Sequence, residues 1–230
     1  MATLWLVATP IGNLEDLTWR ALRILKEADF VLCEDTRVTK KLLDHYQIKT
    51  PTISYHQHSG ELKVDKIIAL LKAGKNLALV TDAGTPGISD PGGKLVSLVR
   101  QELGTAVLIV SVPGASALGA ALSIAGAGFD HFLFLGFLPH KKGRQTKLKE
   151  IMTSEYPVVL YESKHRIVKL LKELEEISLA PPIVLEVMVA RELTKLHESF
   201  YQGTPAEILE ILNQNPLNLK GEFVVLIKKK

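Results

Sequence analysis

The sequence predicts an α/β protein with two α/β domains, the first of which is built on a mainly parallel sheet. Short apolar runs alternate with helical patterns through the first half of the chain. Connections rich in glycine and proline follow several of these runs. Near 112–116 a Pro-Gly turn interrupts the alternation, and a more charged second half follows. We therefore expect an N-terminal domain over residues 1–113 and a C-terminal domain over residues 114–230.

The first half shows a regular alternation of strand and helix patterns. Apolar, β-branched runs typical of buried parallel strands cover residues 4–8, 30–33, 52–55, 77–80 and 107–110. Between them, apolar residues at spacings of three and four predict helices over 17–27, 39–45, 62–72 and 94–102. This order of elements predicts a doubly wound parallel sheet.

The second half has longer and more charged segments between its strands. The expected strands cover residues 132–135, 158–161, 183–187 and 223–227. Helices are expected over 167–176 and 205–213, and a helix of small residues after the Pro-Gly turn. The tract at 228–230 consists of lysines and is interpreted as a solvated tail.

Composition places the chain among ordinary globular proteins. Of its 230 residues, 47% are hydrophobic and 23% are charged. The net charge is only +3, so the overall charge does not by itself indicate a nucleic-acid-binding protein. The single cysteine, Cys33, excludes an internal disulfide and fits a reducing compartment. The chain starts without a basic signal-peptide region, and Pro113-Gly114 breaks its longest uncharged stretch, 103–129. We expect a cytoplasmic protein without a membrane anchor.

The most informative segment is the loop at 81–93, which follows the apolar run 76–80. It contains four glycines, two prolines and two aspartates. Glycine allows close backbone approach to a ligand, and proline stiffens the loop. A Walker A motif is excluded by the spacing before Lys94 and by Leu95 in place of the metal-binding hydroxyl. The loop predicts a small-molecule site at the carboxyl end of a strand.

Two further strand-end loops resemble it. Residues 9–14 follow the first strand but lack the glycine spacing of a dinucleotide fingerprint, so a plain turn is equally compatible. Residues 113–117 follow the fifth strand and open a helix, whose N–H groups suit a carboxylate or a ribose. The alternative there is a domain junction with Ser116 as the helix cap.

Charged clusters near strand ends provide candidate catalytic groups. Glu34 and Asp35 are suited to act as a general base or to orient a hydroxyl, while the alternative is helix capping by Asp35 with Arg37 as its surface partner. The clusters at 161–166 and 190–198 are either functional or solvated.

Two other polar segments have less specific patterns. The basic run at 140–149 fits either an exposed helix end or a contact surface for phosphates. His56 and His58 have no partner at metal-ligand spacing, so we expect no metal site.

Several strings occur together in one order along nearly the whole chain. They are Leu6-Val-Ala-Thr-Pro-Ile-Gly-Asn-Leu14, Glu34-Asp-Thr-Arg37, Thr81-Asp-Ala-Gly-Thr-Pro-Gly-Ile-Ser-Asp-Pro-Gly92, Val112-Pro-Gly-Ala-Ser-Ala117, Tyr161-Glu-Ser163, Ala190-Arg-Glu-Leu-Thr-Lys195 and Gly221-Glu-Phe-Val-Val225. Together they resemble the tetrapyrrole methylase superfamily, and within it the branch that methylates ribosomal RNA.

This resemblance implies a fold and an activity. It implies two α/β domains, the N-terminal one with a mainly parallel sheet and the C-terminal one with a mixed sheet. S-adenosylmethionine (AdoMet) would bind in a cleft between them, and the protein would be a homodimer. It also implies 2′-O-methylation of a cytidine ribose in the decoding region of small-subunit (16S) ribosomal RNA. The partner would be that RNA or the assembled small ribosomal subunit.

The resemblance also implies cofactor-binding residues. In porphyrin-modifying relatives a Gly-Gly-Asp-Pro loop holds the cofactor, and Thr85 stands here in place of its aspartate. The implied cofactor-lining positions are Pro10, Ala83, Gly84, Thr85, Pro86, Ile88, Ser116, Ala117, Glu162, Val189 and Val224.

For catalysis we hypothesise that Glu34 or Asp35 assists the 2′-hydroxyl and that Arg37 holds a phosphate, with Glu162 and Arg191 on the acceptor side. Two alternatives stay open. One is a precorrin or porphyrin C-methyltransferase, and the other is a non-catalytic RNA-binding assembly factor. The basic run at 140–149 argues against the first, and an aromatic content of only 6% argues against the second.

Overall fold

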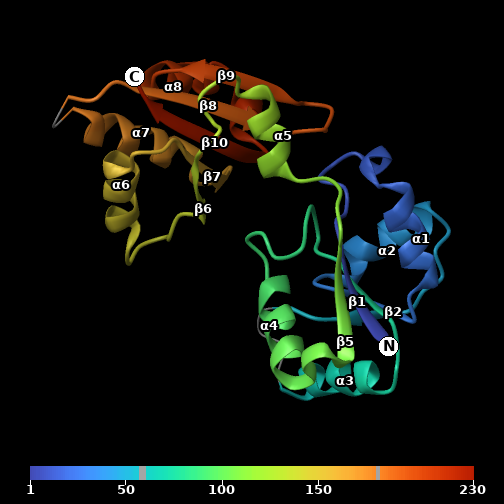
Figure 1. The fold of residues 1–230 in the computed structure, drawn as a ribbon. Helices are drawn as coiled ribbons and strands as arrows, with labels where there is room; N and C mark the ends of the chain where they lie inside the picture. The colour runs from blue at the N-terminus through green and yellow to red at the C-terminus, as the bar shows by residue number, and fades with distance from the viewer. Residues whose placement is uncertain (57–60, 180–181) are drawn as a thin grey trace. The chain divides into compact units, whose positions relative to one another are not determined.

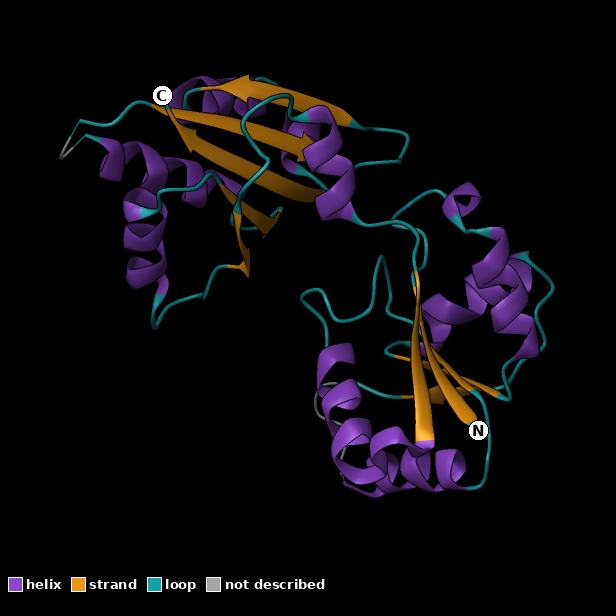
Figure 2. Cartoon of the chain, viewed as in Figure 1, coloured by secondary structure: helices purple, strands orange, loops and turns teal. Residues whose placement is uncertain are grey.

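The computed structural model describes residues 1–56, 61–179 and 182–230. The chain divides into two compact units, Met1–Ser116 and Ala117–Lys230, each with its own sheet and helices (Figures 1 and 2). The division falls at the start of the first helix after the Pro-Gly turn, a little later than the expected boundary at 113/114.

Unit 1 contains a five-stranded sheet in the order β3-β2-β4-β1-β5. The strands are β1 (Ala2–Val7), β2 (Phe30–Cys33), β3 (Thr52–Ser54), β4 (Leu77–Leu79) and β5 (Val107–Val112). Every pairing between them is parallel, for example Leu4 with Leu77 and Val31 with Thr52. The predicted parallel sheet of the N-terminal half is confirmed.

Four α-helices of unit 1 cover the two faces of this sheet. They are α1 (Trp19–Glu27), α2 (Thr36–His45), α3 (Glu61–Lys72) and α4 (Gly92–Leu103), with short 3₁₀ turns η1 (Leu14–Asp16) and η2 (Gly104–Ala106). Thr18 and Asp35 cap α1 and α2 by accepting backbone N–H groups, which fixes where each helix begins. Leu25 of α1 and Leu43 of α2 pack on one face, whereas Ile67 of α3 and Leu95 of α4 pack on the other.

Unit 2 contains a mixed five-stranded sheet in the order β6-β7-β10-β8-β9. The strands are β6 (Leu133–Phe137), β7 (Val158–Ser163), β8 (Leu185–Arg191), β9 (Ser199–Gly203) and β10 (Glu222–Lys229). β6 pairs parallel with β7, and the other pairings are antiparallel. The predicted mixed sheet of the C-terminal half is confirmed.

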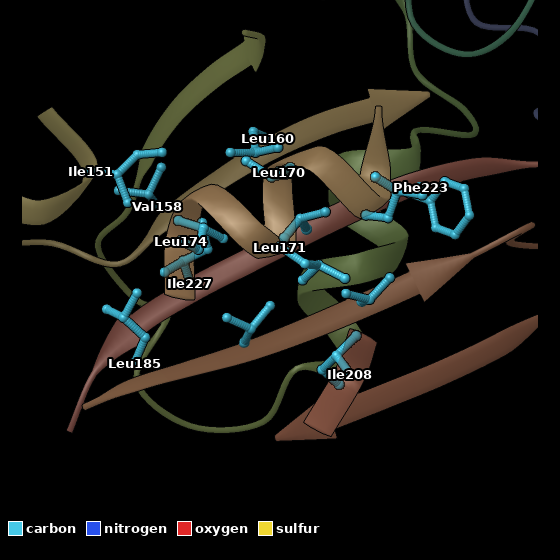
Figure 3. Packing of buried hydrophobic residues seen from close by; sticks show 14 of the residues in the cluster. Ile151, Val158, Leu160, Leu170, Leu171, Leu174, Leu185, Ile208, Phe223 and Ile227 are labelled. Atoms are coloured by element: carbon cyan, nitrogen blue, oxygen red, sulfur yellow. The ribbon is translucent and has the colours of Figure 1, made fainter. Parts of the chain in front are cut away.

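The helices of unit 2 are α5 (Ala117–Ile124), α6 (Arg144–Thr153), α7 (Ile167–Ser178) and α8 (Pro205–Asn213), and η3 (Pro216–Leu219) is a 3₁₀ turn. α6, α7 and α8 pack on one face, where Figure 3 shows Leu170, Leu171 and Leu174 of α7 against Leu160 and Ile227 of the strands. These apolar side chains are buried and form the core that stabilises the unit. α5 contacts β10.

Two elements differ from the sequence-based expectations. β9 was not expected, because Ser199-Phe-Tyr-Gln-Gly203 lacks the apolar run of a buried strand and completes an edge of the sheet. α6 was not expected as a helix of its own, since its charged residues hide the apolar pair Leu148 and Ile151 that faces the core. In the part of the chain that is described, no helix is long and apolar enough to cross a membrane.

Candidate functional site

The loops that follow β1, β2, β4 and β5 lie at the same edge of the unit 1 sheet, because parallel strands end together. We call residues 9–13, 34–35, 81–91 and 113–116 the strand-end rim. β4 lies between β2 and β1, and the helix that follows it packs on the opposite face from α1 and α2. The connection after β4 therefore leaves toward one face of the sheet, whereas the connections after its neighbours β1 and β2 leave toward the other face. Open α/β sheets bind ligands at such switch points.

Hydrogen bonds join the loops after β1 and β4. The backbone N–H of Thr9 donates to the Gly84 carbonyl at 3.0 Å, and the Gly84 N–H donates back to the Thr9 carbonyl at 3.0 Å. The Thr9 hydroxyl also donates to the Thr81 carbonyl at 3.2 Å. Gly84 has a φ of +82°, and an added Cβ would lie 3.3 Å from Ile11 Cγ2. Glycine is therefore suited to this position both in conformation and in space.

The loop after β5 is attached to the same structure. The Thr85 hydroxyl donates to the Ala115 carbonyl at 3.1 Å. Gly114 packs so closely on Ala8, the residue after β1, that an added Cβ would lie 3.0 Å from Ala8 Cβ. Thr85 thus has a defined role here: it connects the β4 and β5 loops.

Asp90 holds the β4 loop in shape from within. Its carboxylate accepts the backbone N–H groups of Gly87 at 2.8 Å, Ile88 at 3.1 Å and Gly92 at 2.6 Å. Satisfying three neighbouring N–H groups with one carboxylate fixes the turn that leads into α4. The loop is therefore organised by its own side chains.

Acidic side chains gather where β2 and β4 end. Burial, together with the negative charges of Asp82 and Asp90, raises the pKa of Glu34 above its usual range. The Asp82 carboxylate accepts the backbone N–H of Asp35 at 3.1 Å, which joins the β2 and β4 loops. Glu34 accordingly holds a proton more readily than an ordinary glutamate.

Asp35 differs sharply from its neighbour. Its carboxylate accepts the Arg37 backbone N–H at 2.8 Å and pairs with the Arg37 guanidinium at 2.6 Å. These hydrogen bonds lower the pKa of Asp35 to about 2. A carboxylate that caps a helix and binds an arginine is a poor proton acceptor.

Glu162 lies in unit 2, in a buried charge cluster with Arg144, Arg166 and Glu173. It is 1% exposed, and its Oε1 contacts Arg166 Nε at 2.7 Å and accepts the Ser163 N–H at 2.8 Å. Its Oε2 forms a long ion pair with Arg144 at 3.9 Å and has no hydrogen-bond partner among the described residues. Arg144 pairs with Glu173 at 2.7 Å. This geometry gives Glu162 a structural position inside the unit.

Arg191 is also buried, at 5% exposure. Its guanidinium donates to the backbone carbonyls of Lys220 at 2.7 Å, His197 at 2.8 Å and Leu217 at 2.6 Å. These bonds join the end of β8 to the β8–β9 turn and to η3. Arg191, which we expected on the acceptor side of the site, therefore donates its guanidinium N–H groups to backbone carbonyls of its own unit.

The remaining implied cofactor positions fall in different surroundings. Pro10, Ala83, Pro86, Ile88 and Ser116 belong to the strand-end rim, and Ala117 begins α5. Val189 points into the core beneath the helices of unit 2, because it belongs to the same cluster as Leu160 and Leu170. Val224 is also buried. It is the neighbour of the core residue Val225 in β10, and because side chains alternate along a strand it faces the other side of the sheet.

Arg144 does not belong to the exposed part of the basic run at 140–149. It is 3% exposed and paired with Glu173, whereas Lys141, Lys142 and Lys149 are exposed. Both interpretations of this run, an exposed helix end and a contact surface for phosphates, place Arg144 at the surface, and this is wrong because α6 turns its side chain inward. His58 lies outside the described residues.

Sequence reasoning left several organising residues out of the candidate site. Thr9, Asp82 and Asp90 hold the strand-end rim together, yet only the density of aspartates in the β4 loop drew attention to two of them. A signal was present for Asp90: an aspartate in a turn commonly accepts the backbone N–H of the residue two positions later, which here is Gly92.

Known proteins resemble this chain over most of its length. Curated relatives that carry the name ribosomal RNA small subunit methyltransferase I come from Synechocystis, Thermotoga maritima and Bacillus subtilis. The Synechocystis protein is 45% identical over 99% of this chain and 79% of its own length. The Thermotoga protein is 41% identical over the full length of both, and the Bacillus protein 42% identical over 99% of this chain and 75% of its own length.

Solved structures show the same fold at low identity. The methyltransferase CobJ superposes with a TM-score of 0.68 at 19% identity, covering 100% of this chain and 95% of its own. Uroporphyrin-III C-methyltransferase from Thermus thermophilus, solved with S-adenosyl homocysteine, superposes with a TM-score of 0.64 at 19% identity. The match covers 98% of this chain and 97% of that protein's chain. The family described as Tetrapyrrole (Corrin/Porphyrin) Methylases matches residues 3–209. With that match and these relatives, the chain belongs to the tetrapyrrole methylase family.

Proposed function

We propose that this protein is an AdoMet-dependent methyltransferase that 2′-O-methylates a cytidine ribose in the decoding region of small-subunit ribosomal RNA. Membership of a methylase family supports methyl transfer, and the names of relatives at 41–45% identity support ribosomal RNA as the substrate. The proposal includes a homodimer in the cytoplasm, with the RNA or the assembled small subunit as partner.

The observation that carries the proposal is the strand-end rim at the switch point of the unit 1 sheet. Hydrogen bonds through Thr9, Gly84, Thr85 and Ala115 join its loops, and Ala83 between them is exposed. Gly84, at φ +82° with Ile11 packed against it, lets the loops after β1 and β4 approach each other closely and so fixes the shape of the strand-end rim. AdoMet, when bound, supplies a methyl group on a positively charged sulfur that is ready for in-line displacement.

Glu34 is the residue that we assign to the proton of the acceptor hydroxyl. Loss of this proton must accompany methylation of a ribose oxygen, and a carboxylate with a raised pKa accepts it more readily than an ordinary one. Asp35 is assigned to capping α2, because its carboxylate is engaged by Arg37. Arg37, whose side chain is 88% exposed, is assigned to a phosphate of the substrate.

The precorrin C-methyltransferase alternative is less well supported. Structures of such enzymes match at only 19% identity, against 41–45% for the ribosomal RNA methyltransferases. The assembly-factor alternative leaves the preformed strand-end rim without a purpose.

Label transfer separates these three functions. Methyl-labelled AdoMet is incubated with assembled small subunits, naked ribosomal RNA and a precorrin, and labelled nucleosides are identified by mass spectrometry. We expect label in 2′-O-methylcytidine from one of the RNA substrates. Label only in the precorrin would favour the first alternative, and no label with no AdoMet binding would favour the second.

Two matched variants test the assignment of the base. Glu34→Gln should reduce methylation by about a hundredfold, the usual size of a general-base contribution, with AdoMet affinity unchanged. Asp35→Asn should leave the chemical step close to that of the wild type. Full activity in Glu34→Gln would remove Glu34 from the mechanism.

A further inference from the structure

A basic hollow lies in unit 1 beside α2 and the start of β3. It has a volume of about 540 Å³, and its lining includes Arg37, Lys40 and Lys49 with a single acid, Asp44. Leu43 and Ile48 also line it, and both are buried. The cations are exposed. The hollow thus combines apolar side chains with three positive charges.

The helical repeat brings these side chains together. Arg37, Lys40 and Asp44 are spaced by three and four residues, so they share one face of α2. Lys49 comes from the connection between α2 and β3, and β3 is an edge strand of the sheet. The charges therefore come from two segments held by the same sheet.

The lysines of the hollow are not neutralised by the protein. Elsewhere surface lysines meet carboxylates, as in Lys75 with Asp29 and Lys147 with Glu150. Within residues 1–56, 61–179 and 182–230, no ion pair engages Lys40 or Lys49. Their charge is available to an anion from outside, and apolar surroundings strengthen such an attraction.

The hollow adjoins the strand-end rim through Arg37. This residue lines the hollow and binds Asp35, whose N–H donates to Asp82 of the β4 loop. A polyanion bound at Lys40 and Lys49 would continue past Arg37 toward Glu34.

We propose that this hollow binds the phosphodiester backbone of the RNA substrate, with Lys40 and Lys49 contacting phosphates next to the nucleotide that is methylated. The inference rests on the proposed function for the choice of RNA. Phosphate contacts position a nucleic acid without reading its sequence, which suits side chains that present charge rather than a fixed hydrogen-bonding pattern.

Equilibrium binding of fluorescein-labelled small-subunit ribosomal RNA, followed by anisotropy over a range of salt concentrations, tests the inference. The Lys40→Gln/Lys49→Gln variant should bind about tenfold more weakly at low salt. Its plot of log K against log salt should be shallower by about 1.4, as expected for two lost phosphate contacts on a single strand. The Lys66→Gln/Lys72→Gln variant is the matched control, because it removes two lysines from α3 on the other face of the sheet.

Asp44→Asn gives a test of opposite sign. Removing the only acid of the hollow should tighten RNA binding about threefold, since it removes a repulsion from the phosphates. Equal affinity and equal salt slopes for the hollow variant and the α3 control would overturn the inference.

The two proposals fail in different ways. If wild-type protein binds AdoMet but methylates no RNA, the proposed function is wrong. If wild-type protein methylates RNA while the hollow variant keeps wild-type affinity and KM, only the hollow is wrong.

Discussion

The two units use polar residues near strand ends in opposite ways. In unit 1 the loops after the strands bind one another through backbone groups and short side chains, and Glu34, Arg37 and Asp82 stay at least partly exposed. In unit 2 Glu162 and Arg191 are almost completely buried and bind groups of their own unit. Position next to a strand end therefore does not distinguish a ligand-binding residue from a structural one. What distinguishes them here is burial: the unit 2 side chains are enclosed by their own unit, whereas those of unit 1 remain open to solvent.

The largest effect is expected for Glu162→Gln. Removing one charge from a buried cluster leaves Arg166 uncompensated and should lower the free energy of unfolding by about 3–5 kcal/mol. Hydrogen exchange with mass spectrometry should show faster exchange in β7 and β10. Glu27→Gln, which breaks the exposed pair with Arg23, is the control and should cost under about 1 kcal/mol. Equal small losses in both variants would contradict the structural role of Glu162.

The next largest effect is expected for Arg191→Met, which should lower the free energy of unfolding by about 3 kcal/mol. The carbonyls of Lys220, His197 and Leu217 would each lose a hydrogen bond. Arg191→Lys should rescue only part of the loss, because an ammonium cannot reproduce the guanidinium fork. Urea denaturation measures the change. A variant of wild-type stability that has lost methyl transfer would instead make Arg191 a catalytic residue.

Thr85→Val tests unit 1 at a smaller scale. The valine keeps the shape but removes the hydrogen bond to Ala115, which should cost about 1 kcal/mol. Because this bond joins two loops of the strand-end rim, AdoMet should also bind several-fold more weakly in a calorimetric titration. Unchanged AdoMet affinity would separate the β4–β5 connection from the cofactor site.

The smallest effect on stability is expected at Glu34. Its pKa in the folded protein is raised from 4.5, so ionisation above that pH works against folding. Glu34→Gln should therefore be slightly more stable than the wild type at neutral pH, and this advantage should vanish below the unfolded pKa. The wild-type methylation rate should fall as the pH drops through the raised pKa. A pH–rate profile without this acid limb would argue against Glu34 as the base.

The sequence predicted the parts of the fold that depend on apolar periodicity. The parallel strands β1, β2 and β4 are mostly apolar, and the parallel sheet follows from the order of elements, whereas the mixed sheet of unit 2 was implied only by the family resemblance. β9 escaped prediction because an edge strand needs no apolar run. α6 escaped because its charged residues dominate the pattern while only Leu148, Ile151 and the unexpectedly buried Arg144 face inward.

The candidate site was predictable in unit 1 and less so in unit 2. Glycine and proline in the β4 loop report a local backbone requirement, which a sequence displays directly. The partners of Arg191 lie up to 29 positions away in the chain, at Lys220, and those of Arg144 lie on α7. Such long-range pairing decides whether a charge serves a ligand or the fold, and it is visible only in three dimensions.

A calorimetric titration of AdoMet into the wild-type and Gly84→Ala proteins tests the cofactor site most directly. We predict that the wild type binds one AdoMet per chain and that Gly84→Ala binds at least about tenfold more weakly. The reason is that a side chain at φ +82° strains the loop and presses against Ile11, which disturbs the contact between the loops after β1 and β4. Equal affinity in the two proteins would contradict the placement of AdoMet on the strand-end rim.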